Sequence, residues 1–209
     1  MPLSELQLTM AAIVLAVPEA EGFALAGGAA LVIHQVVDRG TNDLDCFGPS
    51  VGAVNALVDP VIRALVGSGL SVATMLRTDG FAKLLVTDAT GRTQVDLGFD
   101  PASLEPVRSI VGPLRHLQDL AGDKLLALFA RAASRDFVDV VGLLRRFTKD
   151  DLCEFAAAKD RGFSVEVLAD AFGVLPTYDR DDEYPNLGDD EYRTLIATFE
   201  VWQRELRGR

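Results

Sequence analysis

The segment FALAGGAALVIHQVVDRGTNDLD, residues 23–45, decides the fold of this chain. A short apolar run at 23–26 is typical of a buried strand and ends directly at Gly27-Gly28. The apolar residues 29–37 predict a helix that begins beside the two glycines. Glycine lets a phosphate approach the backbone, and the first turn of a helix offers free N–H groups.

Two carboxylates alternate around Leu44, the first residue of the next predicted strand, residues 44–47. Asp43 and Asp45 are two positions apart, so their side chains share one face, roughly 6.6 Å apart along the strand. Mg²⁺ binds through one or two carboxylates plus substrate phosphates. A two-metal site clamps the attacking and leaving oxygens, and a third carboxylate is expected from a neighbouring strand. Asp96 is the candidate, although an exposed strand could also carry an acid at little cost.

The first half of the chain predicts a mixed sheet with helices packed against it. Gly40 is expected to stop the 29–37 helix, and Pro60 to interrupt the helix over 51–66. The remaining elements of this half are a helix over 5–15 and strands over 71–76, 81–87 and 93–97.

After Pro101 the pattern becomes helical. We predict an α/β (α+β) chain of two lobes, with the sheet in 1–107 and helices in 108–209. The acidic run 179–185 is expected to be a solvated loop. The predicted helices of the second lobe are 120–133, 136–147, 151–159, 165–172 and 189–206.

The composition is that of a globular protein: 209 residues, 49% hydrophobic and 24% charged. No apolar run approaches the roughly 18 residues of a membrane span, and no basic leader precedes the first apolar stretch. We therefore expect a cytoplasmic protein with no membrane partner. Cys46 and Cys153 lack metal-ligand spacing and are expected to be free thiols.

The charge of the chain is unevenly distributed. The net charge of −11 argues against a nucleic-acid partner. Residues 108–149 nevertheless carry a net +4, between flanking segments of −7 and −8. This segment would suit a polyanionic partner, although composition alone favours ordinary helix-surface charges.

The glycine pair, the spacer and the run Arg39-x-Thr41-x-Asp43-Leu-Asp45 together resemble the nucleotidyltransferase superfamily signature. The finer pattern is similar to the AbiEii/AbiGii toxin family, which includes the mycobacterial MenT toxins. The resemblance extends over about residues 23–147. Its second region contains Lys124, Arg131, Arg135, Asp136, Phe137 and Asp139.

This resemblance implies a bilobed fold and transfer of a nucleoside monophosphate from an NTP, with release of pyrophosphate. For the MenT-like branch it implies a pyrimidine nucleotide as donor and the 3′ end of tRNA as acceptor, which blocks translation. It also implies a cognate antitoxin as partner.

The resemblance also assigns residues. Asp43 and Asp45, with Asp96 as a third candidate, would hold Mg²⁺ in a two-metal site. Gly27, Gly28, Arg39, Thr41 and Lys124 would bind the nucleotide, and Asp139 would complete the catalytic set with Lys124 and the three aspartates. The base could be Asp45 or Asp96, and the sequence does not separate them.

Thr41 suggests a regulatory hypothesis. A phosphate on its hydroxyl would add about −2 charge beside the two carboxylates and could occupy the place of the triphosphate on Arg39. The alternative is a hydroxyl that only caps the turn.

Other readings stay open. The acceptor could be a small cationic molecule, as in antibiotic modification, or a protein, and the chain could be a non-catalytic nucleotide-binding module. Lys124 could lie on a solvated helix face. We expect His34 to be structural, and Phe199 and Trp202 to be helix-packing residues.

Overall fold

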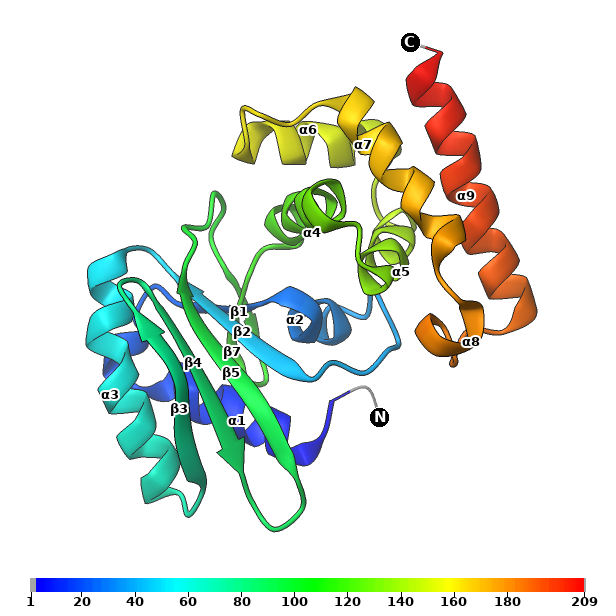
Figure 1. The fold of residues 1–209 in the computed structure, drawn as a ribbon. Helices are drawn as coiled ribbons and strands as arrows, with labels where there is room; N and C mark the ends of the chain where they lie inside the picture. The colour runs from blue at the N-terminus through cyan, green and yellow to red at the C-terminus, as the bar shows by residue number, and fades with distance from the viewer. Residues whose placement is uncertain (1–2, 209) are drawn as a thin grey trace. The chain divides into compact units, whose positions relative to one another are not determined.

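The computed structural model describes residues 3–208 and confirms the mixed α/β fold (Figure 1). The chain divides into two compact units, the first ending at Leu120 and the second starting at Ala121. This division lies further along the chain than the predicted junction at 107/108, because two short strands after residue 106 join the sheet of the first unit.

One seven-stranded sheet organises the first unit, in the order β3-β4-β5-β2-β1-β7-β6. The strands are β1 (Ala24–Ala26), β2 (Asp43–Gly48), β3 (Ser71–Thr78), β4 (Phe81–Thr87), β5 (Arg92–Phe99), β6 (Val107–Ser109) and β7 (Gly112–Leu114). Central strand β2 runs parallel to β5 and antiparallel to β1, and β1 runs parallel to β7. The strands predicted from residues 23–97 are all present, and only β6 and β7 were missed.

The two faces of the central strands differ in chemistry. Leu44 and Cys46 of β2 are buried, while Asp43 and Asp45 alternate with them and point to the opposite face. Helices α1 (Glu5–Ala16) and α3 (Val51–Gly67) pack against the sheet. Burial raises the pKa of the Cys46 thiol, and the charges of Asp45 and Asp96 add to this rise, so Cys46 stays a protonated core residue.

Two predicted helix boundaries in the first unit were wrong. Helix α3 runs through Pro60 without a break. It buries a face that includes Val54, Leu57 and Val61, and this burial outweighs the roughly 3 kcal/mol cost of an internal proline. Helix α2 covers only Gly27–Ile33, because Gln35 adopts a positive φ of 57° and ends it well before Gly40.

The second unit is helical around an aromatic core. Its helices are α4 (Leu117–Arg131, which begins in the first unit), α5 (Ser134–Leu143), α6 (Lys149–Lys159), α7 (Val165–Ala171), α8 (Arg180–Glu183) and α9 (Asp189–Arg207). Phe199 and Trp202 are buried, as predicted, and Phe199 meets Phe137 at a centroid distance of 4.9 Å. The expected loop at 179–185 instead contains α8, because the Asp179 carboxylate caps two of its backbone N–H groups.

Among residues 3–208, no helix combines the length and apolar character needed to cross a bilayer.

Candidate functional site

The two glycines pack directly on residues of the Arg39–Asp45 motif. Ala26, the last residue of β1, pairs with Asp45 of β2, and α2 starts at the next residue. Gly27 has a φ of +60°, and a Cβ there would lie 2.7 Å from Cγ of Asp45. A Cβ on Gly28 would lie 3.0 Å from the Thr41 hydroxyl oxygen and 3.1 Å from Nη2 of Arg39. Only glycine allows this packing, so the structure gathers Arg39, Thr41 and Asp45 around the glycine pair at the start of α2.

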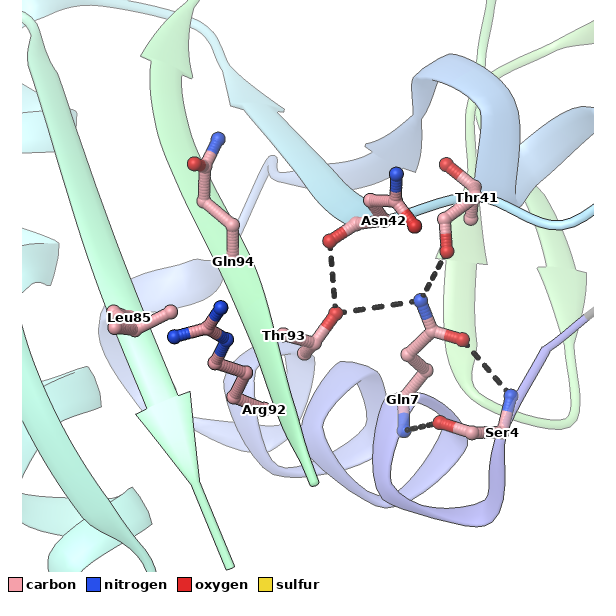
Figure 2. Close-up of a pocket in the computed structure, with 8 residues that line it drawn as sticks. All are labelled: Ser4, Gln7, Thr41, Asn42, Leu85, Arg92, Thr93 and Gln94. Atoms are coloured by element: carbon pink, nitrogen blue, oxygen red, sulfur yellow. Dashed lines mark hydrogen bonds between the residues drawn. The ribbon is translucent and has the colours of Figure 1, made fainter. Parts of the chain in front are cut away.

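Helix α1 fixes the loop that leads into Asp43. Gln7 is only 5% exposed, and its amide nitrogen donates to the Thr41 carbonyl at 2.7 Å and to the Thr93 hydroxyl at 3.3 Å (Figure 2). The Thr93 hydroxyl in turn donates to the Asn42 carbonyl at 3.0 Å. The Thr41 hydroxyl then donates to Oδ1 of Asp43 at 2.8 Å. This chain of hydrogen bonds holds the carboxylate of Asp43 in place.

Asp96 reaches the same face of the sheet from β5. In the parallel register, Asp96 pairs with Asp45, and Gln94 pairs with Asp43. We call this side of β2, β5 and β4 the acidic face, defined by Asp43, Asp45 and Asp96. The side chain of Asp96 is 13% exposed, so a fully solvated surface acid is excluded.

The environment of Asp96 disfavours its charge. Burial raises the pKa of its carboxyl above the ordinary value. Lys83, whose Nζ lies 3.6 Å from Oδ2, and Gln94, which donates to Oδ1 at 2.9 Å, oppose this rise, whereas the charge of Asp43 adds to it. A raised carboxyl pKa near two other carboxylates is typical of functional sites.

Lys83 and Gln94 were not singled out from the sequence. Lys83 stands opposite Asp96 in the antiparallel pair β4–β5. The turn between these strands contains Thr90-Gly91, a turn signal in the sequence, and the structure closes it with a hydrogen bond from the Asp88 N–H to the Gly91 carbonyl. Counting back from that turn would have placed Lys83 beside Asp96.

The three aspartates fit a hard cation in part. Asp43 and Asp45 offer two carboxylates on one face, the number through which Mg²⁺ commonly binds beside substrate phosphates. Asp96 is held by Lys83 and Gln94. Within residues 3–208, no three acidic, histidine or cysteine side chains already stand together as a metal site. The donor set suits magnesium, and recruitment of Asp96 requires it to exchange its present partners.

The second unit holds the other predicted residues in two ion pairs, each with a buried carboxylate. Lys124 of α4 binds Asp139 of α5 at 2.9 Å, with side chains 9% and 0% exposed. Arg131 binds the buried Asp136 through two hydrogen bonds, at 2.8 and 3.0 Å. The solvated-face alternative for Lys124 is therefore wrong. Both pairs join α4 to α5.

His34 has a structural contact, as expected. Its Nε2 lies 3.0 Å from the carbonyl oxygen of Arg115, at the end of β7.

The glycine turn packs on Asp45, and Asp96 lies beside Asp45 on the neighbouring strand. This arrangement is suited to hold a triphosphate beside cations, as a nucleotidyltransferase requires. The chain belongs to the family described as nucleotidyl transferase AbiEii toxin, type IV toxin–antitoxin system, whose family model matches residues 9–201. The protein is therefore a nucleotidyltransferase toxin, and the resemblance noted from its motifs is confirmed.

Solved structures share the fold. JHP933 from Helicobacter pylori superimposes with a TM-score of 0.63 at 17% identity, covering 99% of this chain and 95% of that one. MenT4, a nucleotidyltransferase toxin from Mycobacterium tuberculosis H37Rv, gives a TM-score of 0.56 at 14% identity, covering 96% and 90%. At these identities the likeness is one of fold. None of the curated proteins matches the sequence.

Proposed function

We propose that the protein transfers a nucleoside monophosphate, from a pyrimidine NTP, to the 3′ end of tRNA in the cytoplasm and so blocks translation. The observation that carries this proposal is the packing of Gly27 and Gly28 onto Asp45, Thr41 and Arg39. Glycine at both positions lets the Asp45 carboxylate and the Arg39 guanidinium approach the backbone closely, and these are the charged groups that would hold a cation and a phosphate. A cognate antitoxin is the expected protein partner, in keeping with the toxin–antitoxin family.

We assign Asp43 and Asp45 as ligands of Mg²⁺, with Asp96 as the third ligand in a two-metal site. Bound magnesium supplies charge neutralisation for the triphosphate and the transferring phosphoryl group. Gly27, Gly28 and Arg39 would bind the triphosphate. In the second unit, Lys124 would bind phosphate and Asp139, its ion-pair partner, would orient it.

The reaction needs positioning and charge stabilisation more than covalent chemistry. The acceptor hydroxyl oxygen forms a bond to the α-phosphorus of the NTP. The bond from that phosphorus to the β-bridging oxygen breaks, and pyrophosphate leaves with its electron pair. The hydroxyl proton passes to a carboxylate, either Asp45 or Asp96.

A labelling assay tests the function. Purified protein is incubated with Mg²⁺, each α-labelled NTP in turn and total tRNA, beside an Asp45→Ala variant. We expect label on tRNA from a pyrimidine nucleotide, lost in the variant and lost when EDTA removes the metal. Label on protein alone would move the acceptor to a polypeptide. Pyrophosphate release without label on either would mean transfer to water, and small cationic acceptors, which the net charge of −11 would attract, should then be added to the assay.

The regulatory hypothesis for Thr41 gives a separate prediction. Thr41→Glu should reduce transfer by about 100-fold or more, because a negative charge would replace the hydroxyl that donates to Asp43 and would repel both carboxylates and the triphosphate. Thr41→Val, which removes only the hydrogen bond, should lose far less. Thr78→Glu, on exposed β3, serves as the matched control. Full activity in Thr41→Glu would end the hypothesis.

A further inference from the structure

A polar cavity of about 580 Å³ opens next to the acidic face, at the starts of β2 and β5 (Figure 2). Its lining includes Asn42 from the loop before β2, Arg92 and Gln94 from β5, and Leu85 from β4. None of the roles assigned above uses Asn42, Leu85 or Arg92. The volume is large enough for a nucleotide.

The cavity reaches the β5 side of the carboxylates through Arg92 and Gln94, and Thr41, which also lies against Gly28, is part of its lining. Gln94 pairs with Asp43 in the strand register, and its amide donates to Asp96 at 2.9 Å. The glycine pair lies on the other side, because Gly27 follows β1 and packs on Asp45. In-line attack places the incoming oxygen opposite the leaving pyrophosphate. With the triphosphate at the glycines, the acceptor therefore enters from the β5 side.

The chemistry of the lining suits a nucleotide of RNA. The cavity offers the exposed positive charge of Arg92, the two side-chain amides of Asn42 and Gln94, and one apolar surface at Leu85. Its eight lining residues include no carboxylate, in a chain with a net charge of −11. Single-stranded RNA ends are recognised by hydrogen bonds to base edges and by stacking or phosphate contacts from arginine.

The wall behind the cavity is already in place. Both ends of the Gln7 amide are engaged, the oxygen by the Ser4 backbone N–H at 2.9 Å and the nitrogen by the Thr41 carbonyl. Ser4 and Gln7 also form the capping box at the start of α1. Binding here would order little of the protein, which favours affinity.

We propose that this cavity is the acceptor subsite and receives the terminal nucleotide at the 3′ end of the RNA. Arg92 contacts its phosphate, and Asn42 and Gln94 hydrogen-bond its base or ribose. The proposal rests on the RNA-directed function above. The donor NTP is the other nucleotide that could fill the cavity, and the test separates the two.

Steady-state kinetics with total tRNA and the preferred NTP provide the test. Arg92→Ala should raise KM for tRNA about tenfold and leave KM for the NTP unchanged. The logarithm of KM for tRNA should also depend less steeply on the logarithm of the salt concentration, by the slope that about one phosphate contact contributes. Asn42→Ala should raise KM for tRNA without changing that slope. Arg77→Ala, an equal charge change on exposed β3, should alter neither KM.

The outcomes are distinct. A rise in KM for the NTP alone, or no change in either KM, would overturn the subsite while the function stands. Wild-type protein that labels no RNA would overturn the function and the subsite together. Because Arg92 and Asn42 are exposed, both variants should fold, and circular dichroism checks this.

Discussion

Replacing Gly27 with alanine is expected to abolish nucleotide transfer. A methyl group at this position would lie 2.7 Å from Cγ of Asp45, far inside van der Waals contact. The carboxylate must move to make room, and a displacement of about 1 Å at a reacting centre costs on the order of 100-fold in rate. The positive φ of 60° adds about 1–2 kcal/mol of backbone strain.

Activity assays and thermal melting of Gly27→Ala should be paired with Gly67→Ala. A Cβ at Gly67, at the end of α3, meets nothing within 4 Å, so that variant should retain full activity and stability. The source of the clash can also be isolated. In an Asp45→Ala background the stability cost of Gly27→Ala should fall towards the backbone strain alone. If Gly27→Ala lost as much stability in the Asp45→Ala background as in the wild type, Asp45 would not be the group that the new methyl group contacts.

The buried pair Lys124–Asp139 gives the second large effect. Asp139→Ala should destabilise the protein by about 3–5 kcal/mol, because it leaves the ammonium of Lys124 without its carboxylate in a site almost closed to water. Chemical denaturation monitored by circular dichroism measures the change. Glu205→Gln is the matched control, since Glu205 pairs with Lys149 at 2.7 Å but is 48% exposed. That variant should lose less than about 1 kcal/mol.

A double replacement separates structure from catalysis at this pair. Lys124→Met combined with Asp139→Leu removes both charges and keeps the volume filled, so most of the lost stability should return. Nucleotide transfer should stay lost, because the ammonium proposed to bind phosphate is gone. Recovery of activity along with stability would restrict the pair to a purely structural role.

The sequence revealed the part of the site that depends on local order. Strand periodicity was enough to place Asp43 and Asp45 on one face, because alternation is a property of the strand itself. The glycine pair was found for the same reason, since its neighbours in space belong to the same 23-residue segment. Asp96 was found only as a carboxylate in a predicted strand. Its pairing with Asp45 depends on which strands lie adjacent, and that is a property of the whole sheet.

What escaped the sequence depends on packing between distant segments. Gln7 supports Thr41 from a helix 34 positions away, and no local pattern marks it for that role. Pro60 stays inside α3 because the buried face of the helix outweighs a local preference for a break. Strands β6 and β7 have three residues each, too few for a period to show. Each becomes a strand through its neighbours in the sheet.

The strand order has a consequence for how the protein matures during synthesis. Strand β2 needs β5 to complete the acidic face, and β1 pairs with β7 through Leu25 and Leu114. Contacts so distant along the chain form slowly and only after the later segment is available. A nascent chain that has not yet exposed residue 99 at the ribosome lacks Asp96 in its final place. The acidic face of the toxin is therefore incomplete until β5 has emerged from the ribosome and paired with β2.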